Sequence, residues 1–487
     1  MDSLLLLCAR RIVAQRPLPA LPADFYPVLF QAAFLDGRAL VLQDLVATWP
    51  FPVLNFQQLL GHLDCAGMIP TLTVSKPSCG RMQELVEPRH QSSGCWLHVL
   101  DMTAVMDDPE WRSEWTSTKA LARACVEVSR HQQKFQRRGS KRHSGCSGAT
   151  TGEATPRPPG MDVHADLVID RIAYGFLCEA LQPGAVGLLR LKCREFQAVN
   201  ISALEIVTLL ESLDPSCLRR VELPVYLGLA DLLMILPHLS RFPELRSLKV
   251  RYSKLDLEHL TPESAIRLRC VARQLGMLSG LRELNLNSTR LSGNLHQILC
   301  DLQAPLESLD LGNCCLVPDD LTFLSQSIHA PALKRLDLWD FNISQDLLEP
   351  FRLLLEEASA SLLHLDLTHG RMDDSHLAAL LPTLLCCSRL RFLGLYGTSL
   401  SMAMIKNLLQ KTLKLPDLHL VAYPIPEDCY KWDQTKFDRN IFFKFVDWEL
   451  LSAAEEDISQ LLANSGRTDL VWTFRTFDHG ALDFFSL

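Results

Sequence analysis

A repeated leucine pattern organises the second half of this 487-residue chain. Residues 306–316 read Leu-Glu-Ser-Leu-Asp-Leu-Gly-Asn-Cys-Cys-Leu and match the template L-x-x-L-x-L-x-x-N/C-x-L. We number the places of this frame from its first leucine, so that places four and six are its two central leucines. Frames of this kind begin at residues 218, 245, 281, 306, 333, 362, 390 and 415. One match would mean little, whereas eight matches at similar spacing predict a repeat array.

The template is that of leucine-rich repeats, and its spacing has a physical reason. Two leucines separated by one residue point to the same side of a short strand. The rest of each repeat must cross back to the next strand, and residues 319–328 carry apolar residues at helical spacing, with Asp319 or Asp320 as a candidate cap. Neighbouring repeats must stack to bury their apolar faces. The wide gap after Leu245 predicts an insertion within residues 254–264.

These features predict an α/β fold, a leucine-rich-repeat solenoid. We expect a horseshoe with a parallel sheet on its concave side, preceded by an N-terminal helical docking segment and followed by a C-terminal cap. Other elements expected outside the clear frames are strands at 97–102 and 162–169 and a degenerate repeat with core residues Leu188, Leu191 and Cys193. In the C-terminal part we expect a helix over 448–463, with Leu450, Leu451, Ile458 and either Leu461 or Leu462 inward, and strands at 470–474 and 483–487.

Five segments follow from this pattern. They are a helical docking segment at 1–60, a first degenerate repeat and cap at 61–130, a disordered basic and Ser/Gly/Pro-rich linker at 131–160, the repeat array at 161–427 and a C-terminal cap at 428–487. Trp111 and Trp115 are interpreted as core residues of one helical face. The basic cluster at 134–142 is either a nuclear-localisation signal or a solvated loop.

Composition excludes several kinds of function. The net charge of −8 gives no support for nucleic-acid binding, and no apolar run approaches the roughly 20 residues that span a membrane. The 16 cysteines show no paired C-x-x-C spacing, so we expect free thiols in a reducing compartment, no metal site and a cytoplasmic protein. Phosphate-loop and hydrolase motifs are missing as well, so we expect no catalytic residues, no cofactor and no enzyme.

The first residues predict an amphipathic helix. The apolar run at 4–9 is shorter than that of a secretory signal, and an acidic residue precedes it. Leu4, Cys8 and Ile12 are four residues apart and therefore share one helical face. Ser3 is a candidate cap for the first turn.

This helix resembles the elongin-C-binding box of cullin-RING ubiquitin ligase receptors, S/T/P-L-x-x-x-C-x-x-x-aliphatic. The matching residues are Ser3, Leu4, Cys8 and Ile12. The resemblance implies a helix-in-groove contact, in which burial of Leu4 contributes about 1.5–3 kcal/mol and Cys8 acts as a small apolar residue. The alternative is a helix that only caps the first repeat.

The following segment resembles the cullin-2 box, hydrophobic-Pro-x-x-hydrophobic-x-x-x-hydrophobic. Its matching residues are Leu21, Pro22, Phe25 and Leu29. Pro22 suits the first turn of a helix, because no amide hydrogen is needed there. Phe25 and Leu29 would then share one face and contact the cullin.

Several longer segments resemble the PRAME family (preferentially expressed antigen in melanoma). They are residues 21–34, 45–52, 96–102, 390–401 and 423–426. The resemblance implies a substrate receptor of an elongin B/C–cullin-2 ubiquitin ligase, with elongin C (bound to elongin B), cullin-2 and an unknown protein substrate as partners. Such a receptor performs no chemistry and acts by holding its substrate near a ubiquitin-charged enzyme.

The concave face is the expected recognition surface. Place five of successive frames holds Glu222, Lys249, Asn285, Asp310, Asp337, Asp366, Gly394 and His419. Three successive aspartates would form a like-charged ladder that a basic partner would stabilise. The candidate substrate-binding residues, from places five and seven, are Arg251, Asp310, Asp337, Trp339, Asp366 and Tyr396. We expect an exposed Trp339 and a substrate Lys or Arg; the alternative is an ordinary solvated strand face.

Two functions remain open on the sequence. The first is the ubiquitin-ligase receptor. The second is a leucine-rich-repeat scaffold or inhibitor that sequesters a signalling or transcription-regulating protein. They differ on whether residues 1–30 are exposed docking helices or buried caps.

Overall fold

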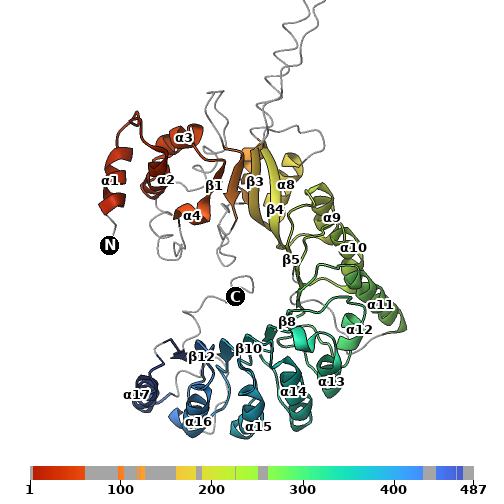
Figure 1. Ribbon diagram of the computed structural model, residues 1–487. Coiled ribbons are helices and arrows are strands. Elements are labelled where there is room, and N and C mark those ends of the chain that lie inside the picture. Colours follow the sequence, from red (N-terminus) through yellow and green to blue (C-terminus); the bar gives the residue numbers. More distant parts are fainter. Residues whose placement is uncertain are drawn as a thin grey trace, which may run out of the picture. The chain divides into compact units, whose positions relative to one another are not determined.

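The computed structural model forms two compact units, Met1–Pro224 and Val225–Leu487 (Figure 1). The structure describes residues 4–60, 97–103, 118–119, 121–126, 161–181, 189–224, 226–250, 261–430, 446–467 and 469–474. Within these ranges, no helix combines the length and apolar character required to span a lipid bilayer.

The first unit begins with helices that pack around aromatic residues. These elements are α1 (Leu4–Val13), η1 (Ala23–Phe25), α2 (Tyr26–Leu35), α3 (Ala39–Ala47) and α4 (Phe56–Leu60). Phe30 of α2 lies edge-to-face against Trp49 at 5.7 Å and against Phe56 at 5.6 Å between ring centroids. All three rings are buried, so they form the core of this helical part.

The strands of the first unit form parallel pairs in sequence order. The elements are β1 (Val53–Asn55), β2 (Val99–Met102), β3 (Met161–Ile169), α8 (Arg171–Ala180), β4 (Leu189–Ala198), α9 (Ala203–Ser212) and β5 (Arg220–Leu223). The strands predicted at 97–102 and 162–169 are confirmed. Trp111, Trp115 and the linker at 131–160, including 134–142, lie outside the described residues.

The degenerate repeat near residue 190 has a different frame from the expected one. Phe196 pairs with Val221, so Phe196 occupies place four and Cys193 occupies place one, where the prediction had Cys193 at place six. The register of β3 and β4 shifts after the pair Ala165 and Cys193, which moves the later residues by one position. Leu191 is also buried, and this explains why the alternative frame fitted the sequence.

The second unit repeats one strand and one helix in regular succession. Its elements are α10 (Leu229–Leu239), β6 (Ser247–Val250), α11 (Pro262–Gly276), β7 (Glu283–Asn285), α12 (Leu295–Leu299), β8 (Ser308–Asp310), α13 (Pro318–Gln326), η2 (Ala330–Ala332), β9 (Arg335–Asp337), α14 (Gln345–Ala358), β10 (His364–Asp366), α15 (Asp374–Leu384), β11 (Phe392–Gly394), α16 (Met402–Thr412), β12 (Leu420–Ala422), η3 (Glu427–Cys429), α17 (Trp448–Ser465) and β13 (Val471–Thr473).

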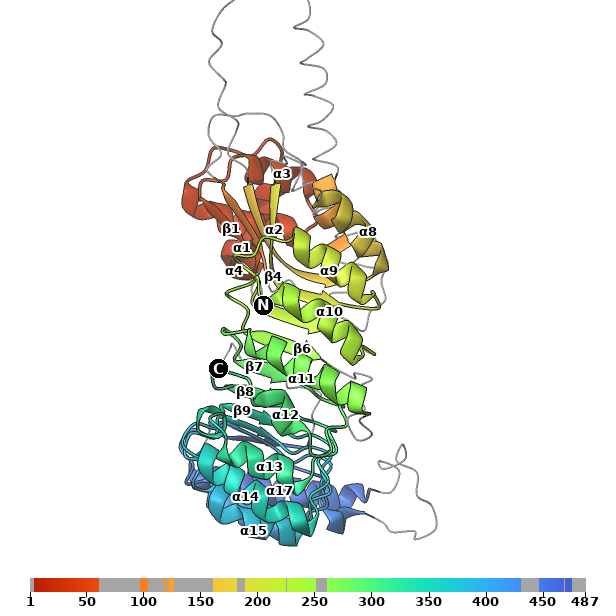
Figure 2. The same ribbon diagram turned by 90° about the vertical axis from the view of Figure 1, so that its right-hand side faces the viewer.

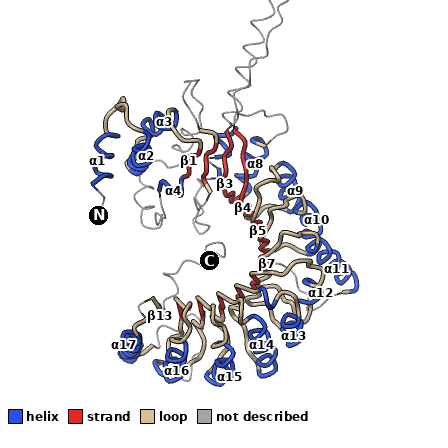
Figure 3. The backbone as a smooth tube through the Cα atoms, in the orientation of Figure 1, coloured by secondary structure: helices blue, strands red, loops and turns tan. Residues whose placement is uncertain are grey.

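Within the second unit, the strands line the inner side of an arc and the helices line its outer side (Figure 3). Figure 2 shows α11 and α12 side by side in front of this row of strands. The pairs from β6 to β13 are parallel. The place-four leucines are buried between sheet and helices: Leu284, Leu309, Leu336, Leu365 and Leu393. The predicted α/β leucine-rich-repeat fold with a parallel sheet is confirmed.

The frame expected at residue 415 is wrong by three residues. Gly394 pairs with Ala422, which gives Leu418, Val421 and Tyr423 places one, four and six. His419 therefore leaves place five and precedes the strand. Leucines at 415, 418 and 420 also satisfy the template. Leu415 and Leu418 are buried, but Val421 and Tyr423 occupy the two central core places and Leu420 is only half-buried.

The insertion expected within 254–264 is partly helix. Thr261 is the N-cap of α11, and its hydroxyl accepts the Ser264 amide at 3.2 Å. Residues 254–260 lie outside the described part of the chain. The cap of α13 also differs from expectation, because Val317 is the N-cap and Asp320 lies three residues into the helix.

Aspartates near helix starts join neighbouring repeats. The Asp320 carboxylate accepts the amides of Gly293 at 2.9 Å and Leu295 at 3.0 Å, both from the preceding repeat. Asp374 accepts the Ser401 amide at 2.9 Å from the following repeat. These buried or half-buried bonds fix one repeat against the next.

The segment expected as a cap contains the predicted helix and one of the predicted strands. In α17, Leu451 and Ile458 are buried as expected, whereas Leu450 is 52% exposed and was wrongly expected inward. Strand β13 pairs in parallel with β12, so the sheet continues through this segment. The strand expected at 483–487 lies outside the described residues.

Candidate protein-binding surfaces

Helix α1 presents an apolar face to solvent. Leu4 is 78% exposed, and Leu5, Leu7 and Cys8 are also exposed. Ile12 is half-buried. Ser3, the first residue of the predicted box, lies outside the described residues. An exposed apolar cluster of this kind is typical of a protein-interaction site.

The opposite face of α1 attaches the helix to the rest of the first unit. Ala9 and Val13 are buried where α1 packs on α2. Arg10 forms an ion pair with Asp36, which follows α2, at 3.2 Å. Because the buried side chains are small and medium-sized, α1 lies on α2 without burying its larger leucines.

The link after α1 is held by a second ion pair. Arg16 donates from Nε to Asp44 Oδ2 at 2.7 Å and from Nη2 to Oδ1 at 3.0 Å. These two hydrogen bonds to α3 fix the orientation of the Arg16 side chain, since the planar guanidinium can donate to both oxygens of one carboxylate. Together with the Arg10 pair, it keeps Leu4 and Cys8 on the outer side of α1.

The four residues of the second predicted box do not share one exposed surface. Leu21 is half-buried, Pro22 is exposed and Phe25 is 42% exposed. Leu29 is 1% exposed and belongs to the core of α2, so the expectation that it contacts a partner is corrected. The turn from the 3-10 helix η1 to α2 separates Phe25 from Leu29, and Pro22 precedes η1 as its cap.

The aspartates predicted on the strand face of the second unit do lie in register. Asp310 pairs with Asp337 across β8 and β9, and Asp337 pairs with Asp366 across β9 and β10. Asp310 and Asp366 are half-buried, whereas Asp337 is only 6% exposed. Arg251, the basic residue expected near them, lies outside the described residues.

Asp337 lies beside Arg335 and His364. The prediction of a like-charged row of aspartates did not include these two partners. Arg335 Nε donates to Asp337 Oδ2 at 2.8 Å, and His364 Nε2 lies 3.1 Å from Oδ1. Burial alone would raise the pKa of Asp337, but the contact with His364 and the charge of Arg335 outweigh it and lower the pKa. The negative charge of the three aspartates is therefore partly neutralised by Arg335, which lies on the same sheet.

The two flanking aspartates have different environments. Asp310 accepts a hydrogen bond from Asn285 on one side and from the Gly312 amide at 3.0 Å. Asp366 accepts the Thr368 amide at 2.9 Å. Burial and the nearby charge of Asp337 raise the pKa of Asp366. Of the three, Asp366 is thus the carboxylate least stabilised in its charged form.

The two residues that contact Asp337 were not identified from the sequence, because both lie at place three of their frames. Arg335 and His364 both occupy this place, and His364 stacks on Phe392 of the next strand at 4.2 Å between ring centroids. Reading place three across the repeats, in addition to places five and seven, would have identified them.

One group of side chains in the described residues has the composition of a metal site. Asp337, His364 and Asp366 each offer a ligand atom, and these atoms lie within 4.8 Å of one another. Arg335 already balances the charge of Asp337 in an ion pair. Among the described residues, Asp337 Oδ1 and both ring nitrogens of His364 are nevertheless buried without a hydrogen-bond partner.

The aromatic residues of the strand face are less exposed than predicted. Trp339 is half-buried, and its indole covers Gly312 so closely that a Cβ there would lie 2.0 Å from Nε1. Tyr396 is half-buried and lies edge-to-face against His369 at 5.3 Å. The expectation of an exposed Trp339 is corrected, since only part of each ring is available to a partner.

Comparison with known proteins agrees with this architecture. The model of the PRAME N-terminal domain matches residues 6–111, and that of the PRAME C-terminal domain matches residues 180–462. Leucine-rich repeat-containing protein 14 of Xenopus laevis is 40% identical over all of both chains, and that of Homo sapiens is 38% identical over all of both chains.

A solved complex of Rad7 and Elc1 in yeast is similar over 98% of this chain and 99% of that one, with 13% identity and a TM-score of 0.42. Similarity at this level does not by itself establish a common fold. The two domain matches and the full-length relatives, in contrast, show that the chain belongs to the PRAME family, in the branch of leucine-rich repeat-containing protein 14.

Proposed function

We propose that this chain is the substrate receptor of an elongin B/C–cullin-2 ubiquitin ligase. In this role α1 binds elongin C, residues near η1 contact cullin-2, and the repeat array holds a protein substrate. The chain performs no chemistry and raises the effective concentration of the substrate near the ubiquitin-charged enzyme.

The observation that carries the proposal is the orientation of α1. A capping helix would bury its largest apolar side chains against the rest of the unit. In α1, Leu4 and Cys8 are instead exposed, while Ala9 and Val13 make the internal contacts. Leu4 and Cys8 are the residues that match the elongin-binding box, and insertion of such a face into a groove is a known mode of helix recognition.

The proposed cullin contact is smaller than the sequence suggested. Leu21, Pro22 and Phe25 retain accessible surface, whereas Leu29 supports them from the core. Phe25 is therefore the residue to change when cullin binding is tested, since substitution of Leu29 would disturb the fold.

The test is direct binding of the purified full-length chain to purified elongin B/C, followed by addition of cullin-2. The Leu4→Ser/Cys8→Asp variant should bind elongin B/C about tenfold to a hundredfold more weakly, because it loses the burial of one leucine and adds a charge. Phe25→Ala should keep elongin binding and lose affinity for cullin-2. Isothermal titration calorimetry measures each step.

A matched control is available on other helices. Leu204 of α9 and Cys270 of α11 are also exposed, so Leu204→Ser/Cys270→Asp makes the same chemical changes elsewhere. This control should bind elongin B/C as the wild type does. If the wild type does not bind elongin B/C, the receptor proposal fails and the scaffold or inhibitor function takes its place.

A further inference from the structure

A row of charged side chains follows one edge of the sheet in the second unit. The residue directly before each of six successive strands, β6 to β11, belongs to what we call the edge row: Arg246, Arg282, Glu307, Lys334, Leu363 and Arg391. These residues occupy place two of their frames. Four of the six are cations, although the whole chain carries a net charge of −8.

Backbone hydrogen bonds hold the edge row in register. The Arg246 carbonyl accepts the amides of Arg282 and Glu283, both at 2.8 Å. The Arg282 carbonyl accepts the amides of Glu307 at 2.7 Å and Ser308 at 3.0 Å in the same manner, and the pattern continues through the row. One side chain per strand is therefore presented at a spacing of about 4.8 Å.

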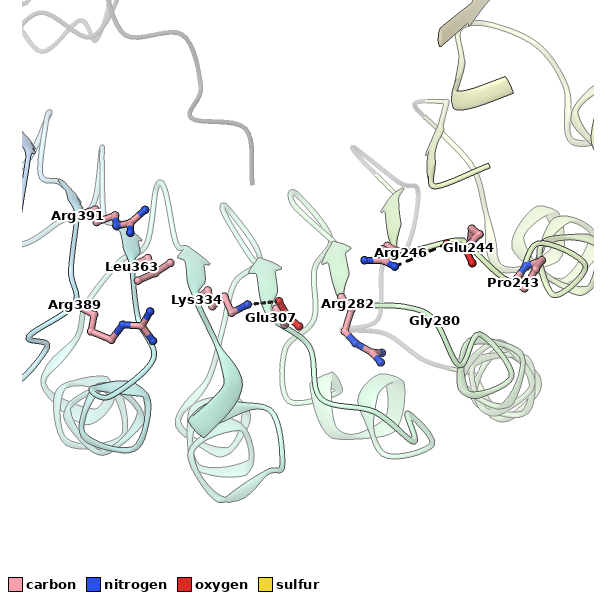
Figure 4. A pocket seen from close by; sticks show the side chains of 10 residues that line it. All are labelled: Pro243, Glu244, Arg246, Gly280, Arg282, Glu307, Lys334, Leu363, Arg389 and Arg391. Atoms are coloured by element: carbon pink, nitrogen blue, oxygen red, sulfur yellow. Dashed lines mark hydrogen bonds and ion pairs between the residues drawn. The ribbon is translucent and has the colours of Figure 1, made fainter. Parts of the chain in front are cut away.

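The edge row lines a groove of about 500 Å³ together with Pro243, Glu244, Gly280 and Arg389. Figure 4 shows these side chains along the edge of the strands, with Arg246 and Arg282 from one end of the row and Arg389 and Arg391 from the other. The lining contains five cationic and two acidic residues.

Within the described residues, two of these five cations have an acidic partner, whereas Arg282 and Arg389 have none. Lys334 pairs with Glu307 at 2.7 Å, and Arg246 lies 3.8 Å from Glu244. Arg282 donates only to the backbone carbonyls of Ser279 and Leu281, at 3.2 and 2.8 Å, which orient the guanidinium without cancelling its charge. Arg389 is exposed, and no acidic side chain of the described part pairs with it. The groove thus carries an excess of positive charge at both ends.

The chemistry of the groove favours a short anionic segment. Arginine binds carboxylate and phosphate groups through two parallel hydrogen bonds, so both groups fit its side chains. A long nucleic acid would meet the negative field of the rest of the chain, whereas a short peptide would experience mainly the local charge. The distance from β7 to β11 is four strand spacings, or about 19 Å, and an extended peptide covers it with about six residues.

We infer that the edge groove binds an extended acidic segment of a partner protein, with carboxylate or phosphoserine groups about six residues apart. One anionic group lies near Arg246 and Arg282, and the other lies near Arg389 and Arg391. Between them, the pairing of Glu307 with Lys334 and the side chain of Leu363 favour a less charged stretch. That this segment belongs to a ligase substrate rests on the function proposed above, whereas the binding site itself does not.

The experiment uses fluorescence polarisation with the full-length chain and labelled nine-residue peptides. Two phosphoserines are placed six residues apart in one peptide and two residues apart in another; further peptides carry glutamate or glutamine at the wider positions. The widely spaced phosphoserine peptide should bind at least about tenfold more tightly than the closely spaced one, because only it reaches both ends. The glutamate peptide should bind more weakly, and the glutamine peptide should not bind.

The variant Arg246→Glu/Arg389→Glu changes one exposed residue at each end of the groove. This variant should bind the widely spaced phosphoserine peptide at least about tenfold more weakly, since each substituted position loses a charge-assisted contact. Arg269→Glu/Arg273→Glu is the matched control, because it makes the same change in net charge at exposed positions of α11. The control should bind the peptide within about twofold of the wild type.

Three results would overturn the inference. The first is that no anionic peptide binds the wild type; the second is that both double variants lose the same affinity. The third is that single-stranded RNA binds more tightly than any peptide, which would assign the groove to nucleic acid. Elongin B/C binding by the Arg246→Glu/Arg389→Glu variant is measured in parallel, so that loss of the groove and failure of the ligase function are distinguished.

Discussion

Two rows of charged side chains cross the same strands of the second unit and differ in how they are balanced. The aspartates at place five have partners on their own and adjacent strands, and Asp337 lies between Arg335 and His364. In the edge row, Arg282 donates only to backbone carbonyls among the described residues, whereas Lys334 and Arg246 each have one acidic neighbour. The comparison teaches that a charged residue of a repeat can bind a partner protein only where the residues at neighbouring places of the frame do not already neutralise it.

The difference follows from burial. A carboxylate as enclosed as that of Asp337 is costly unless cations or donors surround it. An exposed guanidinium remains solvated and requires no such partner. The aspartates are therefore closed to a partner by their own contacts, whereas the exposed Arg246 and the half-buried Arg282 of the edge row keep accessible surface.

The largest expected effect comes from Asp337→Asn. This change leaves Arg335 without its partner, and we expect it to lower the free energy of unfolding by about 3 kcal/mol at pH 7. Because the pKa of Asp337 is lowered from 3.8 in the folded protein, its stabilisation is present above that pH and is lost as the pH falls. Urea denaturation of the full chain at pH 7 and at lower pH measures both effects.

The half-buried Asp310 provides the control for this variant. Asp310→Asn should cost about 1 kcal/mol, less than Asp337→Asn, because Asp310 is only half-buried and an asparagine there can still accept from a side-chain amide and a backbone amide. If both variants lost the same free energy of unfolding, the contacts of Asp337 with Arg335 and His364 would add no stability beyond that of an ordinary half-buried aspartate.

A smaller effect of opposite sign is expected from Asp366→Asn. The pKa of Asp366 is raised by burial and by Asp337, so its charged form destabilises the folded protein at neutral pH. The neutral amide should increase the free energy of unfolding by about 0.5–1 kcal/mol at pH 7. The gain should disappear as the pH falls through the folded pKa of Asp366, where the wild-type carboxyl is itself neutral. A loss of stability at pH 7 would contradict this reasoning.

The smallest effect is expected at Arg389, which lines the groove together with the edge row. Arg389 is exposed, so Arg389→Gln should change the free energy of unfolding by less than about 0.5 kcal/mol. Urea denaturation beside the Asp337→Asn variant measures this contrast on one scale. A loss above about 1 kcal/mol would mean that Arg389 has a structural partner and that this end of the groove is less available than described.

Most of the fold could be predicted from the sequence because the leucine template is strict where the core is regular. Leu309 and Leu311 are separated by one residue and are both buried, as the template requires. The prediction failed where two frames satisfied the same leucines. In the frame expected at residue 415, Val421 and Tyr423 take places four and six, where Leu418 and Leu420 were expected, and only strand pairing decides between the two registers.

The candidate surfaces were less predictable, because exposure depends on tertiary neighbours. An amphipathic helix at α1 was correctly expected, but the sequence left open whether Leu4 and Cys8 would be exposed or buried. Helix α2 is apolar on nearly all sides, so its sequence could not indicate that Leu29 faces the core. In the same way, the residues around Asp337 come from adjacent strands and could not be found by considering place five alone.

The aspartates at helix starts have a consequence for the cooperativity of the second unit. Asp320 and Asp374 each connect two repeats through backbone amides, so a repeat that opens also breaks bonds of its neighbour. Stability in a repeat array is shared between the repeats and their interfaces, and strong interfaces suppress opening of single repeats. The repeats of α12 and α13 should therefore open together, as should those of α15 and α16, and a partner bound at one repeat of a pair would protect both repeats from unfolding.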